Sequence, residues 1–178
     1  RYNLMHNDFV LVGPPTDPAG IRGREIGAAL AGIARAGVTF VTRGDRSGTH
    51  TRELALWKQA GVGVPTGSWY LEAGQGMGAT ARIASEKQAY TLMDRGSFLA
   101  LQASLSLVIV SEGSEELLNR YGVIVVSPSA HPGVRAAQGK TLADWLVSAE
   151  GQKLIGEFGV KRFGRALFVP DAPAGGAR

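Results

Sequence analysis

A loop rich in charged and hydroxyl side chains, residues 43–49, contains the residue types best suited to binding an anion. Arg43 presents a fixed fork of hydrogen-bond donors, and the hydroxyls of Ser47 and Thr49 flank Gly48. The loop precedes an expected helix, whose first N–H groups lack partners within the helix and carry partial positive charge. We therefore expect these residues to form a binding site for a tetrahedral oxyanion.

The same loop also fits a purely structural interpretation. Ser47 or Thr49 could cap the helix, and Arg43 could pair with Asp45 at an ordinary corner between a strand and a helix. The loop lacks the Gly-x-x-x-x-Gly-Lys-Ser/Thr pattern of a P-loop, so a nucleotide phosphate site is not indicated. Composition alone leaves both interpretations open.

A second glycine-rich turn, residues 74–78, lies between another expected strand and helix. Glycines at alternate positions let the backbone approach a ligand closely, which makes Gln75 and Gly76 further candidates for ligand binding. The spacing differs from the dinucleotide-binding pattern. The alternative is a helix that packs tightly on the sheet.

Charge and composition exclude several other functions. The 178 residues carry 19 Lys+Arg and 15 Asp+Glu, a net charge of +4, and the basic residues are scattered, which argues against nucleic-acid binding. The absence of cysteine excludes disulfides and thiolate chemistry. The three histidines show no metal-ligand spacing, and no nucleophile stands beside a plausible base, so we expect no cofactor, no metal site and no catalytic residue.

Strands that alternate with helices indicate an α/β fold with a mixed, mainly parallel sheet flanked by helices. The pattern predicts strands at 9–12, 38–41, 69–72, 90–93, 107–110 and 121–127. It predicts helices at 24–35, 49–60, from the second glycine turn to about 87, 97–101, 142–147 and 151–158. We expect the helix at 49–60 to bury Leu54 and Trp57, and the tail 172–178 to be disordered.

Several of these stretches, taken in order, resemble the tungstate-binding proteins of bacterial ABC importers. The resemblance runs over about residues 3–171. It rests on residues 7–14, 43–50, 69–70, 74–80, 83–87 and 89–92, with 121–124, 131–132 and 150–152. Within it, Arg43 and Thr49 match the ligand-contacting loop of that family, with Ser47 and Gly48 as close neighbours.

The resemblance implies the two-lobed periplasmic-binding-protein fold of the second type. Residues 1–14 would be the first strand to cross between lobes, 15–120 the second lobe, and 121–171 the return strand and the C-terminal part of the first lobe, before the tail. It also implies tungstate or molybdate as ligand, with tungsten present only within the bound oxyanion. The expected partner is an ABC transporter permease, and the expected location is periplasmic or extracytoplasmic.

One departure from the family concerns the first lobe. The family has an N-terminal Thr/Ser-rich loop that supplies oxyanion donors, and nothing here corresponds to it. We expect the first-lobe remnant to pack against another chain or against an N-terminal segment. Two other functions stay open: phosphate binding, or a ligand-less domain for sensing or protein interaction. A carboxylate of Asp45 facing the anion favours phosphate, whereas one turned onto Arg43 favours tungstate or molybdate.

Overall fold

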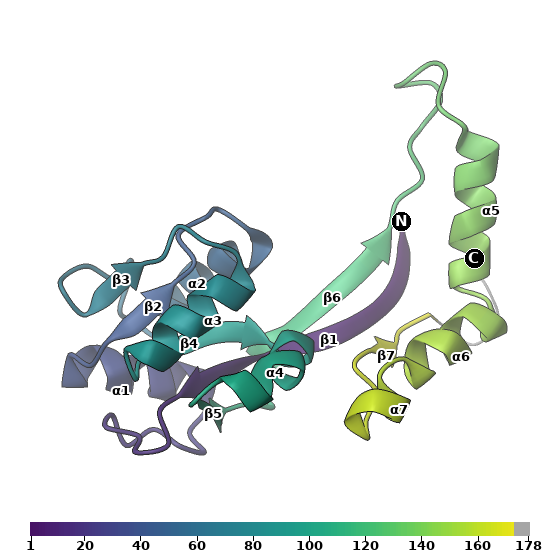
Figure 1. Cartoon of the computed structure of the whole chain (residues 1–178). Coiled ribbons are helices and arrows are strands. Elements are labelled where there is room, and N and C mark those ends of the chain that lie inside the picture. The colour runs from purple at the N-terminus through teal and green to yellow at the C-terminus, as the bar shows by residue number, and fades with distance from the viewer. Residues whose placement is uncertain (173–178) are drawn as a thin grey trace. The chain divides into compact units, whose positions relative to one another are not determined.

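The computed structural model describes residues 1–172 and divides the chain into two compact units (Figure 1). The larger unit is Asp8–Leu118, and the smaller unit joins Arg1–Asn7 to the chain from Asn119 onward. Strands β1 (Tyr2–Gly13) and β6 (Leu118–Val123) carry the chain from one unit to the other.

The sheet of the larger unit is mixed, as the sequence predicts. β1 pairs antiparallel with both β4 (Thr91–Asp94) and β5 (Val108–Ser111), so those two strands point the same way. β2 (Phe40–Thr42) and β3 (Tyr70–Glu72) are parallel, and a parallel bridge from Phe40 to Tyr90 links β2 to the start of β4. Strands β2, β3, β4 and β5 therefore run in one direction and β1 in the other.

Helices cover both faces of this sheet because β1 alternates its apolar side chains between two core clusters. Phe9 and Leu11 pack in the cluster of α1 (Ile26–Ala36) and α2 (Gly48–Gln59). Val10 and Val12 pack in the cluster of α3 (Met77–Glu86) and α4 (Arg95–Leu101). Two short 3-10 turns, Gln102–Ser104 and Glu115–Leu117, complete the unit.

The predicted helices and strands of this unit are present, with shifts of a few residues at their ends. The prediction that Leu54 is buried is wrong, because Leu54 is half-buried. The buried residues of α2 are Thr49, Glu53, Leu56 and Trp57. A carboxylate, Glu53, thus occupies a position on the inner face of the helix.

The smaller unit is mostly helical. It contains α5 (Ala136–Leu146), α6 (Ala149–Glu157), α7 (Val160–Phe163) and β7 (Val169–Pro170). β7 pairs antiparallel with the start of β1, at Met5 and His6. Ser148 caps α6 by accepting a hydrogen bond from the N–H of Gly151.

The strand predicted at 121–127 is wrong over its second half. β6 ends at Val123, and Ile124 and Val126 are exposed. A β-branched run forms a strand only where another strand accepts its hydrogen bonds, and no described strand pairs with residues 124–127. The helix predicted at 142–147 begins earlier, at Ala136. In the predicted disordered tail, Ala172 donates its N–H to Gln152 Oε1, and residues 173–178 lie outside the described part.

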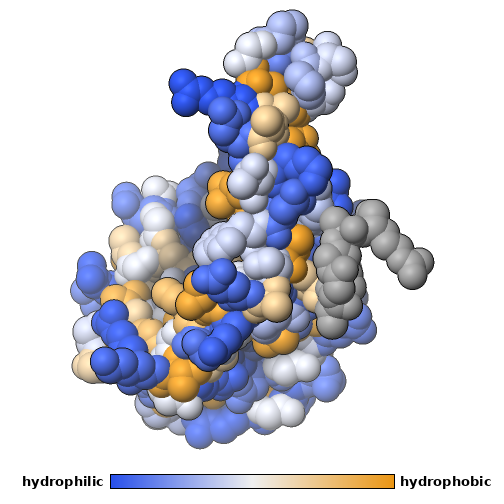
Figure 2. Space-filling model, turned by 90° about the vertical axis from the view of Figure 1, so that its right-hand side faces the viewer, coloured by the Kyte–Doolittle hydropathy of each residue, from blue (hydrophilic) through white to orange (hydrophobic). Residues whose placement is uncertain are grey.

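An apolar groove runs along the smaller unit. Figure 2 shows hydrophobic patches between hydrophilic ones on the face turned to the viewer. The groove is lined by Met5, Trp145, Leu146, Gly151, Leu154, Ile155, Phe158 and Phe168. Leu154 and Phe158 are exposed by 51% and 59%. That another chain or an N-terminal segment covers this face stays a prediction.

Candidate anion-binding site

Three strands of the larger unit end at one edge of the sheet, and each leads into a helix. Because β2, β3 and β4 run in the same direction, their last residues, Thr42, Glu72 and Asp94, lie at that edge. This is the edge at which open α/β sheets bind ligands. The N–H of Gln75 donates to the carbonyl of Arg43 at 3.3 Å, so the structure brings the two predicted loops together there.

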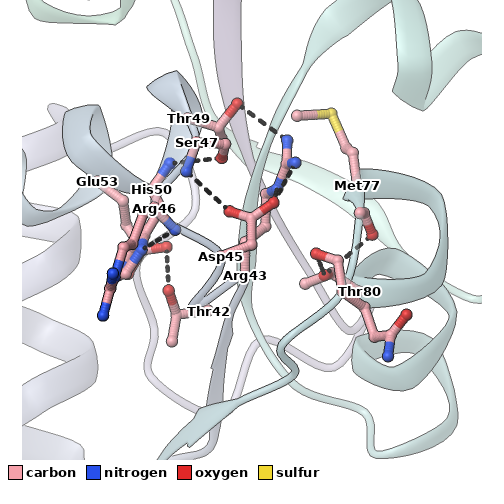
Figure 3. Close-up of polar contacts among 12 residues, drawn as sticks. Thr42, Arg43, Asp45, Arg46, Ser47, Thr49, His50, Glu53, Met77 and Thr80 are labelled. Atoms are coloured by element: carbon pink, nitrogen blue, oxygen red, sulfur yellow. Dashed lines mark hydrogen bonds and ion pairs between the residues drawn. The ribbon is translucent and has the colours of Figure 1, made fainter.

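The first loop is organised around the guanidinium group of Arg43 (Figure 3). Its Nε donates to Asp45 Oδ2 at 3.0 Å, and its Nη2 pairs with the same oxygen. Its Nη1 reaches Thr49 Oγ1 at 3.4 Å, near the first turn of α2. One edge of the guanidinium is therefore held by a carboxylate, and the other edge meets the hydroxyl at the helix N-terminus.

Asp45 is turned into its own loop. Its Oδ1 accepts the N–H of Ser47 at 3.1 Å, and its Oδ2 accepts from Arg43. The pKa of the Asp45 carboxyl is lowered to about 2, chiefly by the hydroxyl of Ser47 and also by the guanidinium of Arg43. The carboxylate is thus fully charged at neutral pH, with both oxygens engaged by loop donors.

Ser47 is the N-cap of α2, where its Oγ accepts the N–H of His50 at 3.3 Å. The structural interpretation of this corner is therefore correct in its details, with Ser47 as cap and Arg43 paired with Asp45. It is also compatible with an anion site. The N–H groups of Gly48 and Thr49 belong to the first turn and have no acceptor within the helix.

The backbone of the loop needs an unusual conformation at two positions. Gly44 has φ +63°, and Arg46 has φ +58°. A side chain at position 44 would also meet the Cβ of Glu72 at 3.1 Å. Glycine at 44 thus lets the Arg43 loop approach the end of β3 closely.

The second loop supplies the N-terminus of α3. Gly76 is the N-cap, with no side-chain hydrogen bond to the helix, and Gln75 and Gly76 are both exposed. Thr80 closes the turn, since its Oγ1 lies 3.2 Å from the carbonyls of Gln75 and Gly76. Gln75 and Gly76 thus lie beside the Arg43 loop, which leaves their predicted role in binding a ligand geometrically possible.

Sequence reasoning missed a buried polar cluster directly below the first loop. Glu53 is 2% exposed; its Oε2 accepts from Thr42 Oγ1 at 2.8 Å, and its Oε1 accepts from the Tyr70 hydroxyl at 2.7 Å and Trp57 Nε1 at 3.1 Å. Burial raises the pKa of the Glu53 carboxyl to about 7. The sequence does contain one signal for this cluster. Glu53 stands four residues before Trp57 and therefore shares the buried face of the helix with it.

Comparison with known proteins identifies the family. Residues 1–150 match the family model described as a PBP superfamily domain. The chain belongs to the PBP superfamily. The described residues contain no cluster of three or more His, Asp or Glu able to hold a metal ion. No helix within residues 1–172 has the length and apolar content needed to cross a membrane.

Three proteins that are similar to this chain have names that mention tungstate. The chain is 43% identical, over 97% of its length, to the tungstate-binding protein TupA of Peptoclostridium acidaminophilum, of which it spans 61%. The solved structure of TupA from Desulfovibrio alaskensis G20 superposes with a TM-score of 0.87 at 43% identity, over 97% of this chain and 70% of that one. The tungstate ABC transporter structure from Geobacter sulfurreducens gives 0.78 at 47% identity, over 88% and 67%.

Proposed function

We propose that this protein binds tungstate, as the solute-binding component of an ABC transporter. The observation that carries the proposal is the meeting of Arg43 Nη1 with the Thr49 hydroxyl near the N-terminus of α2. A guanidinium edge, a hydroxyl and free helix N–H groups are the donors that an oxyanion requires. The choice of tungstate among oxyanions is supported by two similar proteins that are named as tungstate-binding.

The position of Asp45 favours an anion that carries no proton. Tungstate and molybdate are fully deprotonated at neutral pH and need only donors, whereas phosphate retains a proton there and gains from an acceptor at its site. Both oxygens of Asp45 are engaged by Arg43 and Ser47. A carboxylate held in this way by its own loop is less available to accept the proton of phosphate, and it keeps Arg43 oriented with its other edge toward Thr49.

Isothermal titration calorimetry tests the choice of ligand. Tungstate, molybdate, sulfate and phosphate are titrated separately into the protein at neutral pH and constant ionic strength. We expect heat from tungstate and molybdate. Heat from phosphate alone would overturn the assignment, and no heat from any of the four would favour the ligand-less alternative.

We further propose that the partner is the permease of an ABC transporter and that the protein acts outside the cytoplasm, in the periplasm or its equivalent. The solved relative named as part of a tungstate ABC transporter supports this. A tungstate uptake assay in cells with and without the gene tests it. Uptake that is unchanged on deletion would contradict a transport role.

A further inference from the structure

A buried carboxyl group joins the two elements that carry the anion donors. Thr42, which bonds to one Glu53 oxygen, directly precedes Arg43 at the end of β2. Glu53 itself lies one helical turn after Thr49 on α2. The other Glu53 oxygen accepts from Tyr70 on β3, the strand that leads into the second loop.

The partners of Glu53 are a threonine hydroxyl, a phenol and an indole, none of which carries a positive charge. An ionised carboxylate that is buried without a cation is costly, so the neutral form is favoured. In the structure Thr42, Tyr70 and Trp57 all donate to this carboxyl group; a proton on Oε2 would reverse the Thr42 bond, because a threonine hydroxyl accepts as well as donates.

We propose that Glu53 is a positioning residue of the anion site, which in its neutral form fixes Arg43, directly after β2, relative to Thr49 on α2. This inference rests on the proposed function. The ionised form would place a negative charge beneath an anion site and would exchange the donated hydrogen bond to Thr42 for an accepted one. The added negative charge weakens anion binding by repulsion.

Other titratable groups near Glu53 could also make anion binding depend on pH. From β3, Tyr70 donates to it and the charge of Glu72 acts on it; β2 contributes the uncharged Thr42. The hydrophobic core cluster that includes α2 also contains the apolar Leu30 and Ile33 of α1 and Leu92 of β4. On α2, His50 lies one turn before Glu53 and accepts the N–H of Arg46, so it needs its own control.

The test measures the dissociation constant for tungstate from pH 5.5 to 9 in the wild type, Glu53→Gln and His50→Asn. Glutamine reproduces the neutral carboxyl, with an acceptor for Tyr70 and Trp57 and a donor for Thr42. We expect wild-type affinity to fall roughly tenfold as pH rises through neutrality, equivalent to one pKa unit of coupling. Glu53→Gln should stay tight at every pH, and His50→Asn should keep the wild-type profile.

Each other outcome is decisive. A wild-type profile in Glu53→Gln, or a flat profile in His50→Asn, would overturn the role of Glu53 while leaving tungstate binding established. Failure of the wild type to bind tungstate at any pH would instead overturn the proposed function, and this inference with it. Carboxyl carbon NMR gives an independent readout, since coupling is reciprocal: tungstate should raise the titration midpoint of Glu53.

A second variant keeps the proposal testable if Glu53→Gln does not fold. Thr42→Val removes only the hydroxyl that bonds to Glu53, and we expect a several-fold loss of tungstate affinity. Thr91→Val on β4 is the matched control. Thr91 is as buried as Thr42, and its hydroxyl donates at 2.7 Å to the carbonyl of Val41, which lies beside Thr42 on β2. An equal loss in both variants would show general damage to the sheet and would overturn the proposal.

Discussion

Asp45 and Arg43 form an ion pair within a single loop, and this pairing leaves the opposite edge of the guanidinium directed at Thr49. An arginine at an anion site must be kept from swinging into solvent, and a carboxylate two residues away does so with little loss of chain entropy. The same pairing keeps the negative charge of Asp45 on its own loop donors. The loop can thus contain a carboxylate and still attract an anion.

Arg43→Ala should abolish most of the affinity for tungstate, with a loss of roughly 100-fold or more, because charge-assisted hydrogen bonds contribute the most to such sites. Arg46→Ala is the control, because Arg46 is exposed and its replacement removes the same charge. Calorimetry on both variants measures the difference. Similar losses in the two would mean that the arginines act only through the overall field of the protein.

The Asp45 carboxyl should titrate near pH 2 in carboxyl carbon NMR spectra, because Ser47 and Arg43 favour its charged form. Its contribution to stability is therefore present above the ordinary carboxyl range and is lost only as pH falls toward 2. In Arg43→Ala the midpoint should move up toward the ordinary value. A midpoint near 4 in the wild type would contradict the pairing.

Glu53 should make the protein less stable as pH rises. Its pKa is about 7 in the folded protein against 4.5 for the free side chain, so stability falls between those two values as the unfolded chain, but not the folded one, loses the proton. Glu53→Gln removes this dependence. Urea unfolding should show the variant gaining up to about 3 kcal/mol on the wild type between pH 5 and pH 8. Parallel stability curves would contradict a neutral buried Glu53.

Gly44→Ala should both destabilise the protein and weaken tungstate binding. The left-handed conformation alone costs alanine about 1 kcal/mol, and contact with the Cβ of Glu72 adds to it. Gly37→Ala is matched to it, since Gly37 has nearly the same φ at the end of α1 with open space around it. Thermal unfolding and calorimetry should show a loss of stability in both variants and a loss of affinity in Gly44→Ala alone.

The sequence was sufficient where local rules determine the structure. Periodicity located α1 and α2, hydroxyl capping narrowed the N-cap of α2 to Ser47 or Thr49, of which the structure has Ser47, and the change from strand to helix placed the Arg43 loop at the edge of the sheet. It failed where a partner far away in sequence decides. Residues 124–127 resemble a strand but have no strand beside them in the described part. Glu53 lies on the buried face of α2, where its hydrogen-bond partners Thr42 and Tyr70 come from strands β2 and β3.

The most direct test of the central claim is the position of the metal atom in a crystal soaked with tungstate. Anomalous scattering at the tungsten absorption edge locates that atom without ambiguity. We predict a single strong peak at the N-terminus of α2, with oxyanion oxygens in hydrogen-bond contact with Arg43 Nη1 and Thr49 Oγ1. A peak elsewhere on the protein, or none at a tungstate concentration that saturates calorimetric binding, would contradict the assignment of this site.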